Sequence, residues 1–159
     1  MIDCLWKIKN SRYPLLRMAI GIFFIVSGFE KLVDPYQNFL YIIQNYSFLP
    51  LFFADSVARF LPWLEFLLGI FLILGLWLKW ALRTLMILLL MFVAVVIQAL
   101  IRRLPITECG CFGGLVSFPL PVTLAFDITI FVCAWLLSFR IQEAQRWSLD
   151  RYFAKNENA

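Results

Sequence analysis

The chain has 159 residues, a length that fits one domain, and 63% of them are hydrophobic while only 15% are charged. Its mean hydropathy of +0.86 is too high for a soluble globular protein. The net charge of +4 does not indicate nucleic-acid binding, because the basic residues lie between apolar runs and form no single patch. The composition therefore predicts an all-α, polytopic membrane protein.

The first part of the chain predicts one membrane span and a shorter helical segment. Residues 1–13 form a basic lead-in, and the first span is expected from Pro14 to Leu32. Arg17, near the start of this span, is expected to snorkel to the lipid headgroups. Residues 36–61 are apolar and aromatic, but Asn45, Pro50 and Asp55 interrupt them. This segment is expected to form short helices that lie in the membrane interface or fold over the bundle.

Three further spans are expected, at residues 62–78, 84–101 and 122–139. Pro62 fits the first turn of a helix, and Lys79 and Arg83 mark the next turn. The predicted fold is a four-helix transmembrane bundle over residues 1–140 with a short interfacial segment between spans 1 and 2. A polar tail, helical at first, follows at residues 141–159.

The basic residues predict the orientation of the four spans. An even number of spans places both termini on one side, and ten of the 14 Lys and Arg residues fall on that side. The positive-inside rule makes this side cytoplasmic, although Arg102 and Arg103 lie on the other face. The expected location is the bacterial inner membrane, with the cysteine-containing loop facing the periplasm.

Cys109 and Cys111 enclose a single glycine, Gly110, in the loop of residues 102–121. A disulfide between them would close a small, strained ring that is easily reduced, which suits thiol–disulfide exchange in an oxidising compartment. Two other interpretations remain open, a metal half-site and a tight turn without chemistry. The chain has no histidine, which weakens the metal interpretation. Cys133, near the middle of the fourth span, is expected to pack as a small hydrophobe.

Two carboxylates lie inside predicted spans, Glu65 in the second and Asp127 in the fourth. Such groups usually face a bundle interior, so both are expected inside the bundle below the cysteine loop. Glu65 is expected to pair with Lys31, Arg59 or Arg102. The pair either fixes helix register or handles protons beside a thiol or a quinone.

Trp63, with Glu65 and Lys31, is a candidate for binding a quinone head group. The tryptophans also fit membrane-interface anchors, as does Tyr46. The residues expected to anchor the chain in this way are Tyr46, Trp63, Trp77 and Trp80.

Three motifs, taken together, resemble the DoxX-like superfamily and most closely its MauE-type branch. The first is Ser27 to Pro35 (SGFEKLVDP) with Gly21, and the second is Leu61 to Glu65 (LPWLE) with Gly69 and Gly75. The third, Cys109 to Gly113 (CGCFG), is the most specific. They occur in the family's order and cover nearly all of the predicted spans.

The resemblance implies a four-helix membrane bundle with the cysteine motif on its extracytoplasmic side. MauE-type proteins are linked to disulfide formation during methylamine dehydrogenase maturation, beside a thioredoxin-like partner. Other DoxX-like proteins are linked to quinone-dependent sulfur oxidation or membrane redox complexes. The resemblance thus implies thiol redox chemistry and leaves the client open.

Two functions follow as hypotheses. The first is a membrane thiol oxidoreductase whose Cys109–Cys111 pair exchanges electrons with a periplasmic thioredoxin-like protein or a sulfur compound, coupled to membrane quinone. Glu65 and Asp127 would then assist proton movement. The second is a non-catalytic scaffold or partner subunit, in which the apolar 36–61 segment docks another protein and the cysteines only brace the loop.

Overall fold

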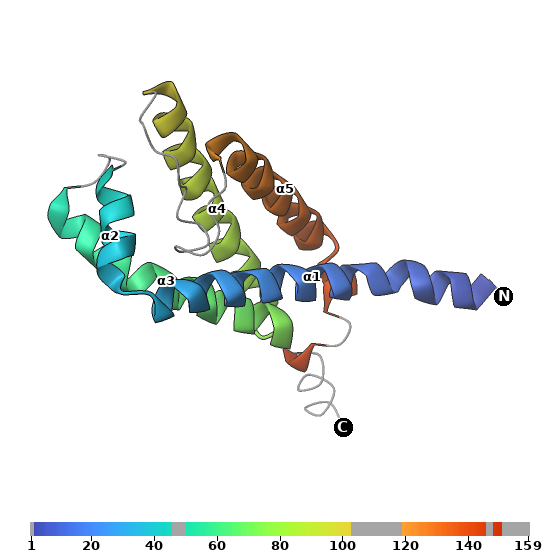
Figure 1. Ribbon diagram of the computed structural model, residues 1–159. Helices are drawn as coiled ribbons and strands as arrows, with labels where there is room; N and C mark the ends of the chain where they lie inside the picture. Colours follow the sequence, from blue (N-terminus) through green and yellow to red (C-terminus); the bar gives the residue numbers. More distant parts are fainter. Residues whose placement is uncertain (1, 46–49, 103–118, 146–147, 151–159) are drawn as a thin grey trace.

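The computed structural model describes residues 2–45, 50–102, 119–145 and 148–150, and over these ranges the chain is helical and contains no strand (Figure 1). The helices are α1 (Ile2–Val33), α2 (Tyr36–Asn45), α3 (Leu51–Leu74), α4 (Leu78–Ile101), α5 (Leu120–Phe139) and α6 (Ile141–Ala144). Three of them are long and apolar enough to cross a membrane, namely Phe52–Leu74, Leu78–Ile101 and Leu120–Phe139. The chain is therefore an all-α membrane protein, as its composition predicts.

The long helices form two antiparallel pairs. In the first pair, Gly21 of α1 lies against Gly69 of α3, and Gly28 lies against Phe66, so the two helices run in opposite directions. In the second pair, the end of α4 packs against the start of α5 through Val96, Ala99 and Leu120. Figure 1 shows the α4–α5 pair running obliquely to the α1–α3 pair.

A leucine-rich core joins the two pairs where they meet. Its fully buried members lie on α3, α4, α5 and α6, and Phe24 of α1 packs into the same cluster. The largest of these buried side chains are Leu72, Leu78, Leu82, Leu85, Leu89 and Leu137. Many large apolar side chains on the outer faces stay exposed, as expected for helices that turn those faces toward lipid.

The prediction that the second span begins at Pro62 is wrong. Helix α3 begins at Leu51 and continues through Pro62. Pro50 does interrupt the chain, with φ −59° and ψ 148° at the N-cap. Asp55 does not, because its carboxylate is on the exposed face and pairs with Arg59 one turn later at 3.1 Å. An i, i+4 ion pair is compatible with a continuous helix.

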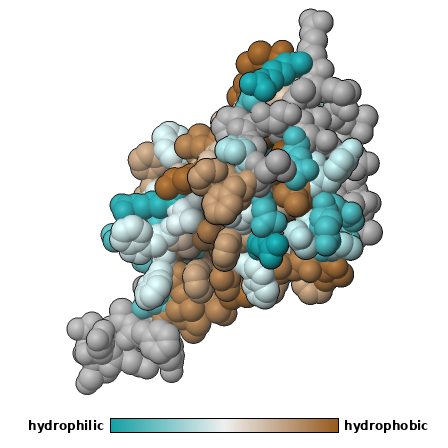
Figure 2. Space-filling model, turned by 90° about the vertical axis from the view of Figure 1, so that its left-hand side faces the viewer, coloured by the Kyte–Doolittle hydropathy of each residue, from teal (hydrophilic) through white to brown (hydrophobic). Residues whose placement is uncertain are grey.

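The segment between the first two spans nevertheless contains a short separate helix, as predicted. This is α2, whose Phe39 is buried while Tyr41 on the same helix is exposed. Figure 2 looks onto the end of the molecule that carries α2, and hydrophilic residues lie there beside apolar ones. A mixed surface of this kind fits the boundary between membrane and water.

The turn between α3 and α4 lies earlier than predicted, at Gly75–Trp77 and not at Lys79–Arg83. Gly75 adopts φ +67° and caps α3, its N–H donating to the carbonyl of Phe71 at 2.8 Å. A left-handed residue after a helix is a common terminator, and glycine adopts it without a Cβ clash. Lys79 and Arg83 therefore lie on the first two turns of α4. Charged residues between two apolar runs suggest a loop, but here they belong to the helix.

The polar tail begins with a short helix, as predicted, and this helix packs against the rest of the molecule. Ala144, the last residue of α6, is fully buried, and Ser148 is 6% exposed.

The prediction that Arg17 snorkels to the headgroups is wrong, because its side chain is completely buried and donates hydrogen bonds to backbone carbonyls.

Candidate functional site: a buried ion pair between α1 and α3

Glycines bring α1 and α3 unusually close together. A Cβ added at Gly28 would lie 2.7 Å from the backbone nitrogen of Phe66 and 2.9 Å from the carbonyl oxygen of Pro62. A Cβ at Gly69 would lie 2.7 Å from the carbonyl oxygen of Gly21. Small residues at such crossings let the backbones of membrane helices touch. The close approach places polar side chains of both helices within hydrogen-bonding range.

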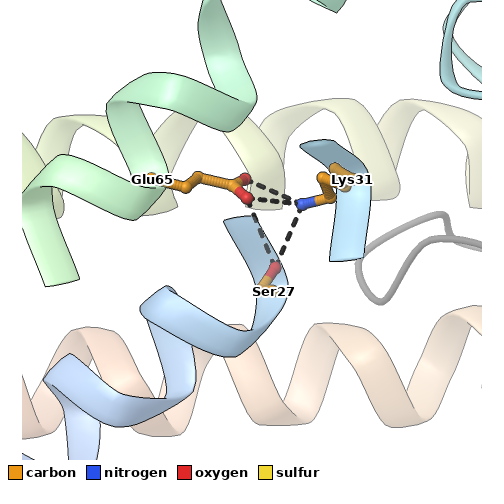
Figure 3. Close-up of polar contacts among 3 residues, drawn as sticks. All are labelled: Ser27, Lys31 and Glu65. Carbon is orange, nitrogen blue, oxygen red and sulfur yellow. Dashed lines mark hydrogen bonds and ion pairs between the residues drawn. The ribbon is translucent and has the colours of Figure 1, made fainter. Parts of the chain in front are cut away.

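Lys31 of α1 and Glu65 of α3 form a buried ion pair at this contact (Figure 3). The Lys31 Nζ atom lies 2.6 Å from Oε2 and 2.9 Å from Oε1 of Glu65. The two side chains are only 2% and 1% exposed. Of the three partners that the sequence offered for Glu65, the structure selects Lys31, while Arg59 pairs with Asp55 at the surface.

Ser27 completes the network. Its hydroxyl accepts a hydrogen bond from Lys31 Nζ at 3.1 Å and donates one to Glu65 Oε2 at 3.3 Å. Ser27 stands one helical turn before Lys31, so both side chains point to the same face of α1. The ammonium group thus has three oxygen acceptors around it, and both carboxylate oxygens are engaged.

Aromatic rings from two further helices flank the ammonium group. The ring centroid of Phe39 in α2 lies 5.5 Å from Lys31 Nζ, and that of Phe92 in α4 lies 5.9 Å from it. Both distances are within the range of cation–π attraction. Lys31 is therefore the point at which α1, α2, α3 and α4 meet.

Burial makes this network energetically critical. A single charge in an apolar, membrane-embedded environment is costly, and a charge of opposite sign at hydrogen-bond distance offsets that cost. Breaking a buried pair by removing one partner typically costs about 3–5 kcal/mol, because the remaining charge is left without compensation. The ion pair therefore holds α1 and α3 in one register, and it keeps one carboxylate and one ammonium group buried between the helices.

Asp127 is also buried, at 6% exposure, on the face of α5 that carries Thr123 and Ile130. The prediction that Glu65 and Asp127 both face the interior of the bundle is confirmed by their burial. Their position relative to Cys109 and Cys111 is not described, because both cysteines lie outside the described residues.

The other predicted site residues are placed differently from the ion pair. Trp63 is 56% exposed and points away from Glu65, which follows it by two residues on the same helix. The structure thus brings Lys31 and Glu65 together without Trp63. Cys133 is partly buried against the main core, as its predicted role as a small hydrophobe requires. Tyr46 lies outside the described residues.

Sequence reasoning missed three members of the site. Ser27 enters the sequence analysis only as the start of a motif, although its spacing of four from Lys31 indicates a shared helix face. Phe39 and Phe92 are two of 17 phenylalanines, and nothing local distinguishes them from lipid-facing ones. Only the packing of α2 and α4 over α1 identifies them.

The chain was compared with protein families, curated proteins and solved structures. No curated protein and no solved structure matches it. A family model described as "Methylamine utilisation protein MauE" matches residues 9–140, which contain α2 to α5 and most of α1. The match includes the buried ion pair and the Cys109–Cys111 motif, and it covers well over half of the sequence. The chain therefore belongs to the MauE family of membrane proteins.

Proposed function

We propose that this protein is an integral membrane thiol–disulfide redox protein. Cys109 and Cys111 exchange electrons with an extracytoplasmic thioredoxin-like protein or a sulfur compound, and a membrane quinone is the electron carrier on the other side of the exchange. The observation that carries the proposal is the Cys109-Gly110-Cys111 motif in a member of the MauE family. The buried Lys31–Glu65 pair adds to it a charged site within a membrane protein.

The connectivity of the helices supports a relation between the motif and the ion pair. The motif lies between the end of α4 at Ile101 and the start of α5 at Leu120. Phe92, which contacts Lys31, lies nine residues before Ile101, a rise of about 14 Å along α4. The Lys31 network is therefore nearer to the end of α4 that leads to the motif than to the end that follows the short α3–α4 turn.

The proposed exchange is a two-electron reaction. A thiolate of the partner attacks one sulfur of the Cys109–Cys111 disulfide and forms a mixed disulfide, releasing the other sulfur as a thiolate. The second partner thiol then attacks the mixed disulfide, so that the partner leaves oxidised and the motif becomes a dithiol. Two electrons and two protons have moved to the motif, and a quinone would take both on becoming a quinol. The same steps run backward when the motif acts as the reductant.

Within this scheme, Glu65 and Asp127 assist proton movement, since they are buried carboxylates in membrane helices. The set proposed for the quinone head group is Trp63 with Glu65 and Lys31, and these three side chains do not all point to one place in the described part of the chain. Glu65 and Lys31 bond to each other, and Trp63 points outward. These three side chains are therefore poorly arranged to bind a quinone head group together. The step of the scheme that rests on residues of this chain is the thiol exchange at Cys109 and Cys111.

Re-oxidation of the motif in membrane vesicles tests the function and the carrier together. After dithiothreitol has been added and removed, we expect the Cys109–Cys111 pair to return to the disulfide form, because a membrane carrier accepts its electrons. Extraction of quinone should slow this return and added quinone should restore it. Gel shifts after thiol alkylation report the two forms. Re-oxidation that is indifferent to quinone would contradict the carrier, and a pair that never re-oxidises would favour the scaffold function.

We also propose that the protein spans the bacterial inner membrane four times with both termini in the cytoplasm. The support is the antiparallel contact of α1 with α3, which carries a candidate span, so that residues 17–31 of α1 run beside residues 62–73. Without Cys4, reduced Cys111 should react with an impermeant maleimide added to intact cells whose outer membrane is permeabilised. Reaction only after lysis would reverse the orientation.

A further inference from the structure

A second buried charged group lies at the other end of the α1–α3 contact. Arg17 of α1 is completely buried, the largest side chain in the described chain to be so. Its Nη1 atom donates to the carbonyl of Ala144 at 2.8 Å, and its Nη2 atom donates to the carbonyl of Ile73 at 3.3 Å. Ile73 is in the last turn of α3, and Ala144 ends α6. One guanidinium group thus joins three helices at the carbonyl-rich ends of two of them.

The C-terminal segment, defined here as residues 141–145 and 148–150, is held at this place by a second polar contact. The carboxylate of Asp150 accepts a hydrogen bond from the N–H of Leu78, the first residue of α4, at 3.4 Å. Asp150 also attracts the guanidinium of Arg17 electrostatically. A carboxylate is favourable at a helix N-terminus because the backbone N–H groups there lack helical partners.

The α3–α4 turn is shaped to accept the segment. Gly75 in that turn has φ +67°, and a Cβ added there would overlap the Cβ of Ser148 and lie 2.6 Å from Arg17 Nη1. The buried side chains of the segment, Ala144 and Ser148, are small. Ala144 belongs to the main hydrophobic core, and Ile141 packs against that core. The polar contacts of Arg17 and Asp150 add to this apolar packing at the far end of the segment and at its backbone.

We propose that the C-terminal segment is a strap and that Arg17 is the residue that fastens it. When closed, the strap ties the end of α5, through α6, to the α1–α3 pair and to the α3–α4 turn. Since Arg17 and Asp150 each hold the segment through one hydrogen bond, loss of either contact loosens the segment without separating the helices that it ties. This device is independent of the thiol chemistry, since it lies at the opposite end of the α1–α3 contact from Lys31.

Hydrogen–deuterium exchange of the full-length protein in lipid nanodiscs tests the strap. The backbone N–H groups of Ala144, Gln145 and Ser148 are hydrogen-bonded in the closed form. In Arg17→Gln, we expect peptides containing them to exchange about tenfold faster or more, since local opening sets their exchange rate. Peptides from the middle of α4 should be unchanged. Arg12→Gln, which removes an exposed arginine from the same helix, is the matched control and should exchange as the unaltered protein does.

A second variant guards against misfolding of Arg17→Gln. Asp150→Asn leaves α1 untouched and removes only the carboxylate from the strap, so exchange in the segment should rise by a smaller factor. Unchanged exchange of the segment in both variants would overturn the proposal. Equally faster exchange in α4 and α5 would overturn it as well, because Arg17 would then support the whole fold and not a local strap.

Discussion

Lys31→Met is expected to destabilise the protein by about 3–5 kcal/mol, because it leaves the carboxylate of Glu65 buried with Ser27 as its one remaining side-chain partner among the described residues. Glu65→Gln is also expected to lower the stability, because the buried Lys31 ammonium group would then face an uncharged amide in place of a carboxylate. Both effects should appear as lower unfolding temperatures in detergent, followed by circular dichroism.

The double variant Lys31→Met/Glu65→Leu separates the electrostatic part of this effect from the packing part. Removing both charges together removes the uncompensated charge, so stability should recover most of the loss seen in either single variant. The surface pair gives the matched control. Arg59→Met breaks an ion pair whose side chains are 58% and 42% exposed, and its effect should be no more than about 1 kcal/mol. A double variant as unstable as the sum of the singles would show that the ion pair is not the source of the coupling.

The same double variant tests whether the pair has a role beyond stability. If Glu65 assists proton movement, the folded double variant should re-oxidise the Cys109–Cys111 pair more slowly than the unaltered protein. If the pair only fixes helix register, re-oxidation should proceed at the normal rate once stability has been restored.

Cys109→Ser and Cys111→Ser are each expected to abolish thiol exchange while the protein still folds and inserts. The described core is formed by the helices, so unfolding temperatures should stay close to those of the unaltered protein. One of the two variants should accumulate a mixed disulfide with an extracytoplasmic partner, because the thiol that would resolve the intermediate is missing. A band that shifts on non-reducing gels and disappears on reduction identifies it.

Cys133→Ala is the control for this pair of variants. Its side chain lies on α5 and packs against the main core. It should therefore leave exchange intact. Full exchange activity in a Cys109→Ser/Cys111→Ser double variant would contradict the oxidoreductase function and favour the scaffold function.

The helical membrane fold could be predicted from sequence because long apolar runs admit few other structures in a membrane protein. Helix ends were harder to predict, because a proline or a glycine can lie at a helix end or inside a helix. The sequence predicts a helix start at Pro62, which lies inside α3, and it assigns no helix end to Gly75, the true terminator. The deciding property of Gly75 is a backbone angle, φ +67°, which the residue type permits without requiring.

The candidate site was predictable in its charges and not in its surroundings. A glutamate in an apolar run demands a partner, so the sequence limited Glu65 to a few cations. The choice of Lys31 follows from the close approach of α1 and α3 at Gly28, a tertiary contact. Arg17 shows the limit of local reasoning. An arginine near a predicted span end usually reaches the headgroups, but here the ends of α3 and α6 offer it carbonyl acceptors.

The reduction potential of the Cys109–Cys111 pair in native membranes tests the central claim most directly. Membranes are equilibrated with glutathione or dithiothreitol buffers of known potential, and the dithiol fraction is measured by alkylation. The proposed function predicts one reversible two-electron transition between about −120 and −270 mV, the range of thiol oxidoreductases. A pair that stays oxidised below about −300 mV, as structural disulfides do, or that never forms a disulfide, would contradict it.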